Sequence, residues 1–148
     1  MTLEQKVMQA LKEAMKEKNK DKLDALRAIK SAILLEKTKG SSKELTEADE
    51  MKILQRLVKQ RKESAEIYQQ QNREDLAQVE LNQIKVIESF LPEQMNEAEI
   101  EAEVKKIIME TGATSMRDMG KVMGIATKKM AGRADGKSIS QIVKKLLS

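Results

Sequence analysis

Apolar residues recur every three or four positions along most of the chain, a spacing that is typical of amphipathic α-helices. In the first half this spacing predicts four helices, each beginning after a short polar residue that can accept a hydrogen bond from the first turn. The four expected caps are Thr2, Asp21, Thr46 and Asn72. We expect the apolar stripes to face a common core, with Leu34 part of the second stripe and Val79 part of the fourth. A loop is expected at Gly40–Ser42.

Pro92 interrupts the helical pattern, because proline donates no backbone hydrogen bond and restrains the residue before it. Three further helices are expected beyond it, and the first of them ends at a glycine that favours the left-handed conformation. The expected boundaries are Asn96 and Gly112, Met116 and Met130, and Ser138 at the start of the last helix.

The composition agrees with an all-α fold. Aromatic residues make up only 1% of the chain and there is a single proline, whereas a β-rich chain needs more aromatic residues and more turn residues. We therefore expect a four-helix bundle-like domain over residues 1–92 and a small three-helix domain over residues 93–148. A long coiled coil is the competing architecture, but frequent caps interrupt the periodicity before it lasts three or four heptads.

The chain contains no cysteine and no histidine. Disulfides, thiolate nucleophiles, the usual zinc sites and histidine general bases are therefore excluded. We identify no catalytic group, no metal ligands and no cofactor site in the sequence. The first residues lack the apolar segment of a signal peptide, and no stretch approaches the roughly 18 apolar residues of a membrane span. These features predict a soluble, cytoplasmic protein with no membrane partner.

Positive charge is concentrated at the C-terminal end, although the net charge of the chain is only +4. Residues 112–148 contain eight lysines and arginines and two acidic residues, whereas residues 93–111 contain two lysines and six glutamates. A localised basic surface indicates a polyanionic partner, while a solvated helical surface is the alternative interpretation.

Five of the six glycines lie between residues 112 and 136. Gly120 and Gly124 are four residues apart, so they lie on one side of the expected helix and allow another backbone to approach, at a cost of about 1 kcal/mol each in helix propensity. We favour close packing between helices as their purpose. The methionines of this helix are expected in the core. The side opposite the methionines is cationic and carries Arg117, Lys121 and Lys128.

The segment Gly132–Lys137 has a different character. Its two glycines are expected to expose backbone amides, Arg133 and Lys137 supply positive charge, and the last helix is expected to begin directly afterwards at Ser138. Backbone amides, cations and the positive end of a helix together favour a phosphate. The glycines are four apart, whereas a nucleotide-binding Walker loop has them five apart.

The motif Asp118-Met-Gly-Lys-Val-Met-Gly124, with Lys128 and then Gly132-Arg-Ala-Asp-Gly136, resembles the signature of the GatB/YqeY domain family. This family includes the tail module of the B subunit of aspartyl/glutamyl-tRNA amidotransferase. The chain length, the helical first half and the sequence Leu-Pro-Glu-Gln at 91–94 are similar to those of stand-alone YqeY-like proteins. In many amidotransferase subunits a proline stands at the position of Gly136.

The resemblance implies that the C-terminal domain contacts tRNA, because the tail module holds tRNA while amide transfer occurs in a separate catalytic domain. We therefore expect an accessory protein that binds tRNA or another structured RNA through phosphates. The candidate RNA-binding residues are Arg117, Lys121, Lys128, Lys129, Gly132, Arg133, Gly136, Lys137, Lys144 and Lys145.

Two alternatives remain open. The resemblance also implies a carbon-nitrogen ligase with glutamine as amido-N-donor, or a tRNA amidase, although no catalytic group is found in the sequence. The other alternative is a non-catalytic interaction module that docks on a protein partner through the side of the helix that carries Gly120 and Gly124.

Overall fold

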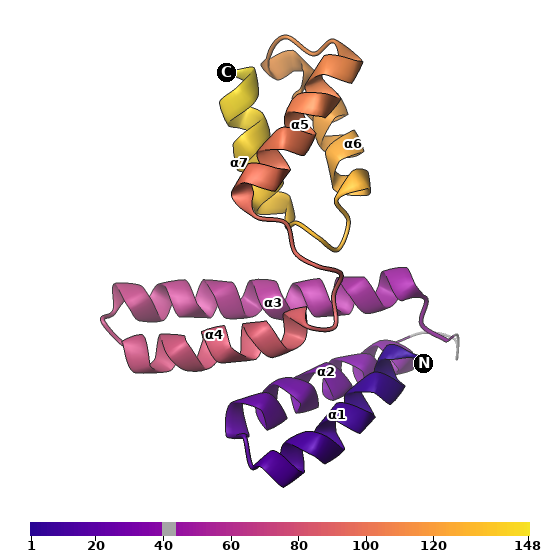
Figure 1. Ribbon diagram of the computed structural model, residues 1–148, viewed down its shortest axis with the longest axis vertical. Helices are drawn as coiled ribbons and strands as arrows, with labels where there is room; N and C mark the ends of the chain where they lie inside the picture. The colour runs from indigo at the N-terminus through magenta and orange to yellow at the C-terminus, as the bar shows by residue number, and fades with distance from the viewer. Residues whose placement is uncertain (40–43) are drawn as a thin grey trace. The chain divides into compact units, whose positions relative to one another are not determined.

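The computed structural model describes residues 1–39 and 44–148, so the loop expected at Gly40–Ser42 lies outside the described residues. The described residues form helices joined by turns, with no strand among them, which confirms the all-α fold. They divide into two compact units, Met1–Leu91 and Pro92–Ser148, which we call the N-terminal and C-terminal units (Figure 1).

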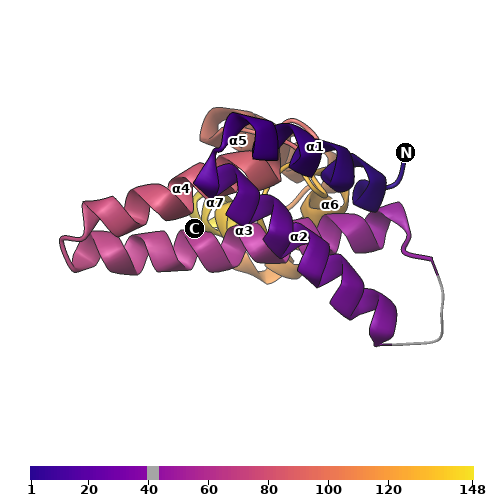
Figure 2. The ribbon, with the colours of Figure 1, turned by 90° about the horizontal axis from the view of Figure 1, so that it is seen from below.

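The N-terminal unit contains four helices that pair as two hairpins. In chain order they are α1 (Leu3–Glu17), α2 (Lys20–Thr38), α3 (Glu47–Gln70) and α4 (Glu74–Glu88). Figures 1 and 2 show α1 beside α2 and α3 beside α4, and α2 also packs against both helices of the second hairpin. Side chains from all four helices form one apolar core, in which Leu26, Ile29 and Ile87 are fully buried.

Two caps of this unit follow the expectation and two differ from it. α1 and α3 begin with capping boxes at Thr2 and Thr46. α2 is capped by Asn19 and not by Asp21, because the Asn19 side-chain oxygen accepts a hydrogen bond from the Lys22 amide at 3.2 Å. Asn19 and Asp21 lie two residues apart, and both residue types are good helix caps.

The start of α4 also differs from the expectation. Asn72 does not cap the helix but takes a left-handed φ of 58° in the turn after α3, a conformation that asparagine tolerates better than most residues. The cap position falls on Arg73, whose side chain makes no capping hydrogen bond.

Two apolar residues expected in the core are exposed instead. Leu34 is 48% exposed and Val79 is 37% exposed. A helix turns about 100° per residue, so Leu34 lies beyond the buried face that Ile29 and Ile33 define. Val79 lies about 200° around α4 from Ala77, which is fully buried.

The C-terminal unit consists of three α-helices and one short 3-10 helix. Its elements are α5 (Glu97–Thr111), η1 (Met116–Asp118), α6 (Met119–Lys129) and α7 (Gly136–Leu147). Each α-helix packs against the other two around a separate apolar core that contains Ile107, Val122 and Val143. Asn96 caps α5, and Gly112 follows the helix with φ of 69°, as expected for a glycine that ends a helix.

The helix expected from Met116 to Met130 is divided. Ser115 caps one turn of 3-10 helix, and α6 itself begins at Met119. Because the tighter first turn changes the direction of its side chains, Met116 lies outside the core and is 44% exposed, whereas Met130 is 1% exposed. Met119 and Met123 are half-buried. The methionine stripe therefore belongs fully to the core only at its C-terminal end.

Candidate functional site

α6 has a buried side and an exposed side. Val122 and Ala126 are fully buried against the core. The exposed side, which we call the α6 face, consists of Gly120, Lys121, Gly124, Thr127 and Lys128. At about 100° per residue these positions span about 120° of the helix surface. The α6 face thus combines two glycines, a threonine and two lysines on one surface.

Gly120 and Gly124 have open space beside them. A Cβ atom built on either glycine would meet no heavy atom within 4 Å outside its immediate helix. Close packing inside the chain, which their spacing was expected to serve, is therefore not their purpose within the described residues. Val122 and Ala126, on the other side of α6, make the helix contacts instead. The glycines leave the backbone of α6 accessible from outside.

Three expected cations lie near this accessible backbone. Arg117 on η1 and Lys121 and Lys128 on α6 are all exposed. None of these three side chains makes an ion pair or a hydrogen bond within residues 1–39 and 44–148. Their charges are consequently not neutralised by a described carboxylate of the chain.

Lys129 differs from these three cations. Its ammonium group lies 3.9 Å from a carboxylate oxygen of Glu103 and 3.6 Å from one of Glu110, both on α5. The acidic helix therefore offsets its charge, although ion pairs at an exposed surface are weak. The remaining expected lysines are exposed on α7: Lys137, Lys144 and Lys145.

The turn between α6 and α7 is closed by the chain itself. Gly132 is buried, with φ of 77°, and its carbonyl oxygen accepts a hydrogen bond from Gln94 Nε2 at 2.7 Å. Arg133 Nε donates to the Glu93 carbonyl oxygen at 3.0 Å, and the Arg133 carbonyl oxygen accepts from the Met95 amide at 2.8 Å. We call these three hydrogen bonds the clasp. The expectation that Gly132 exposes its backbone is wrong, because segment 93–95 covers it.

α7 begins at Gly136, two residues before the expected cap, because Asp135 and not Ser138 is its N-cap. The Asp135 Oδ1 atom accepts a hydrogen bond from the Ser138 amide at 2.9 Å. This carboxylate also complements the positive end of the helix dipole. It occupies the position at which a phosphate was expected, while Gly136 and Lys137 remain exposed.

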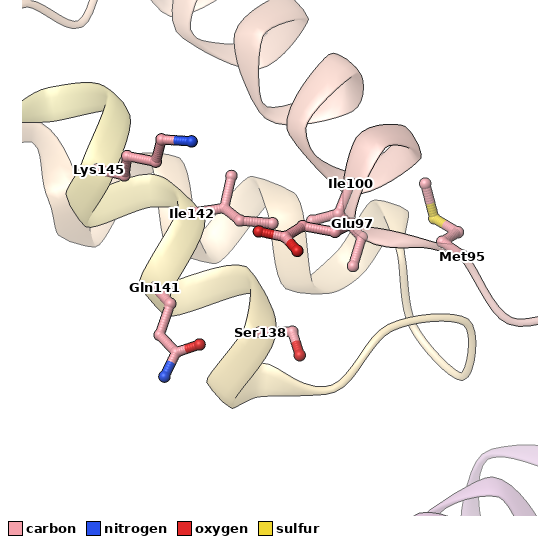
Figure 3. Close-up of a pocket in the computed structure, with 7 residues that line it drawn as sticks. All are labelled: Met95, Glu97, Ile100, Ser138, Gln141, Ile142 and Lys145. Carbon is pink, nitrogen blue, oxygen red and sulfur yellow. The ribbon is translucent and has the colours of Figure 1, made fainter.

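A pocket of about 300 Å³ lies between the start of α5 and α7 (Figure 3). Ile100 and Ile142 are buried residues of its wall, and Met95 is half-buried beside them. Figure 3 shows Glu97 extending from the start of α5 toward α7, while Lys145 belongs to α7. Lys145 alone of these residues was a candidate in the sequence, because no motif or spacing relates the start of α5 to α7.

Arg61 is a half-buried cation of the N-terminal unit. Burial lowers the pKa of Arg61 from its ordinary value, and Glu80 partly opposes this shift. The guanidinium group donates from Nε to Gln83 Oε1 at 2.8 Å and from Nη1 to the Leu57 carbonyl oxygen at 3.1 Å. Arg61 therefore joins α3 to α4.

Among the described residues there is no group of three or more acidic residues that could hold a metal ion.

The fold and the α6 face define a small helical protein of two units, whose C-terminal unit presents cations without a partner among the described residues beside an accessible helix backbone. The profile of the family described as Yqey-like protein matches residues 4–147. The chain belongs to this YqeY family, which confirms the resemblance at the level of the family.

Several fungal relatives are similar to this chain. A protein of Pyrenophora tritici-repentis named "Altered inheritance of mitochondria protein 41, mitochondrial" is 30% identical over 93% of this chain and 76% of its own length. The protein of that name from Clavispora lusitaniae is 37% identical over 55% of this chain and 46% of its own length. The one from Lachancea thermotolerans is 31% identical over 68% and 54%. The match spans about half the length of these last two relatives.

These names correct the expectation of a cytoplasmic protein, because the relatives are mitochondrial proteins. The expectation depended on the lack of a secretory signal peptide, and that feature does not separate the cytoplasm from an organelle reached by other targeting signals. No helix in the described part of the chain has the length and apolar content needed to cross a bilayer.

Proposed function

We propose that this protein is an accessory protein that binds tRNA or another structured RNA along the α6 face. One observation carries the proposal: Lys121 and Lys128 have no partner in the described residues, and they lie along one side of a helix backbone left open by two glycines. Phosphate contacts dominate the affinity of nucleic-acid binding, and unpaired lysines supply them.

The two glycines give the proposed interface its shape. Without side chains at Gly120 and Gly124, a ribose or a phosphate can approach the backbone of α6 more closely than it could approach a helix covered by side chains. At about 100° per residue Lys121 and Lys128 lie on the same side of the two glycines, so both can contact phosphates along that side. Arg117 extends the same cationic surface beyond the start of α6.

Recognition along the α6 face depends on the RNA backbone. The two aromatic residues of the chain, Tyr68 and Phe90, both belong to the N-terminal unit, so the C-terminal unit has no ring on which bases can stack. Backbone recognition is mainly electrostatic and depends strongly on salt. The resemblance to the tail module of the amidotransferase subunit supports tRNA as the RNA, as an analogy between folds.

The test is the salt dependence of tRNA binding, measured with the full chain. The logarithm of the affinity should fall linearly with the logarithm of the salt concentration. Lys121→Ala with Lys128→Ala should reduce the slope by about two, because each phosphate contact contributes about one. The matched control is Lys105→Ala with Lys106→Ala, which removes the same charge from exposed positions of α5 and should leave the slope nearly unchanged.

Three results would overturn the proposal. Binding that does not respond to salt is one, and an equal loss from both pairs of variants is another, because it would indicate attraction to net charge alone. The third is a protein that co-purifies after nuclease treatment and is released by the α6 variants, which would make the α6 face a protein interface.

A further inference from the structure

We propose that the pocket between α5 and α7 holds one unpaired nucleotide of the bound RNA, with a guanine base against Glu97 and a phosphate against Lys145. This inference rests on the proposed function and adds to it a site for a particular base. The α6 face contacts only the RNA backbone, whereas the pocket provides side chains that distinguish one base from another.

The pocket has the size and the wall that such a ligand needs. Its volume of about 300 Å³ is at the lower end of the range of small-ligand sites, which suits a single nucleotide. Ile100 and Ile142, which are 4% and 6% exposed, contribute apolar atoms to its wall. Met95 adds a polarisable thioether beside them. The clasp fixes this residue, since its amide donates to the Arg133 carbonyl oxygen at 2.8 Å.

The two charged groups of the pocket have opposite requirements. An ionised Glu97 accepts hydrogen bonds only, and Lys145 donates only. They come from different helices and do not form an ion pair with each other or with another described residue. A ligand that satisfies both must present donors at one end and an anion at the other. It must also present an apolar face between the two ends.

Guanine meets the first requirement better than the other RNA bases. Its Watson–Crick edge places the N1–H and N2–H donors side by side, so one carboxylate can accept both in parallel. Adenine and cytosine present one donor beside an acceptor on that edge, and uracil presents one donor between two acceptors, so each would bring an acceptor against Glu97. Unpaired bases are the usual targets of sequence-specific RNA recognition because this edge is free.

The remaining polar groups suit the sugar. Ser138 and Gln141 also line the pocket, from the first turns of α7. A hydroxyl and an amide both donate and accept, which matches the ribose hydroxyls of RNA. The phosphate is then left for Lys145, whose charge has no partner within the described residues.

The experiment titrates the full-length protein with guanosine, adenosine, cytidine and uridine 5′-monophosphates. Binding is followed by NMR shifts of the backbone amides of residues 97–100 and 138–145. The guanine nucleotide should bind about tenfold or more tightly than the other three, the discrimination typical of a bidentate base contact. Glu97→Gln should abolish this preference, because the glutamine amide presents a donor to one of the two guanine donors.

Two further variants separate the roles of the groups. The matched control Glu99→Gln changes the same charge two residues away, outside this pocket, and glutamine preserves the capping box with Asn96. It should keep the preference for guanine. Lys145→Ala should weaken all four nucleotides by a similar factor, because all four carry the same phosphate.

Three results of the nucleotide titration would overturn the inference. Equal affinity for the four nucleotides is one, and loss of the preference for guanine in Glu99→Gln is another. Shifts at these amides with free leucine but not with the nucleotides would also overturn it, in favour of a zwitterionic amino acid. The nucleotide titration uses no structured RNA, so it can fail while tRNA still binds the α6 face with the expected salt slope. The guanine preference can equally hold while the α6 variants have no effect.

Discussion

Replacing Gly124 with alanine should strengthen the fold and weaken RNA binding in the same molecule. Gly124 lies in the interior of α6, and an added Cβ would meet nothing within 4 Å outside its immediate helix. Glycine is about 1 kcal/mol less favourable than alanine in a helix interior, and no clash offsets that gain. We therefore expect Gly124→Ala to stabilise the C-terminal unit by about 1 kcal/mol. For a unit of this size the corresponding rise in Tm is about 4–8 °C.

The same substitution at Gly112 should have the opposite effect. Gly112 has φ of 69° after α5, and alanine is strained in that region of backbone space. Gly112→Ala should therefore destabilise the unit by about 1–2 kcal/mol. The pair forms a matched comparison, because both variants add one methyl group to an uncrowded position and only the backbone conformation differs.

Amide hydrogen exchange detected by NMR measures the stability of the C-terminal unit separately from that of the N-terminal unit. The slowest amides of α5, α6 and α7 should exchange about fivefold more slowly in Gly124→Ala, since a factor of ten corresponds to about 1.4 kcal/mol and the expected gain is about 1 kcal/mol. The affinity for tRNA should fall in this stabilised protein. Two results would refute the reasoning: a loss of stability, which would require a neighbour beside Gly124, or tRNA binding equal to that of the wild type.

Two further predictions concern helix caps. Asp135→Ala removes the N-cap of α7, so it should destabilise that helix by about 1 kcal/mol and speed its amide exchange. Asp135→Asn should retain most of the stability, because asparagine caps equally well. Equal losses of stability in the two variants would mean that the charge and not the hydrogen bond matters. The hydrogen bond from the Thr46 amide, followed by that from its hydroxyl, lowers the pKa of Asp49, so its folded pKa lies below the unfolded value of about 3.9. Its stabilising effect is therefore present above the unfolded pKa and is lost as the pH falls through the folded pKa. The stability difference between wild type and Asp49→Asn should narrow between about pH 5 and pH 2, and a difference that stays constant would contradict the assignment.

The features that the sequence predicted correctly are local. The capping boxes at Thr2, Thr46 and Asn96 and the left-handed glycine at Gly112 all depend on contacts within four residues along the chain. The helical periodicity is equally local, which is why the all-α fold could be read from the spacing of apolar residues.

The features that the sequence did not predict depend on residues far apart. Burial of Gly132 depends on Gln94, and the pocket brings Glu97 near α7. No periodicity relates those segments. The open space beside Gly124 is also a property of the packed unit, because a glycine pair has the same spacing whether or not a helix covers it.

The clasp has a consequence for how this architecture can be assembled by evolution. All five residues that it joins, from Glu93 to Arg133, lie within Pro92–Ser148, so the first residues of the C-terminal unit are anchored without help from anything that precedes them. A recombination event that exchanged every residue up to Leu91 would leave these hydrogen bonds intact. The C-terminal unit could therefore be joined to another N-terminal sequence with these hydrogen bonds retained. The same boundary would let the unit follow a different preceding domain without loss of these hydrogen bonds.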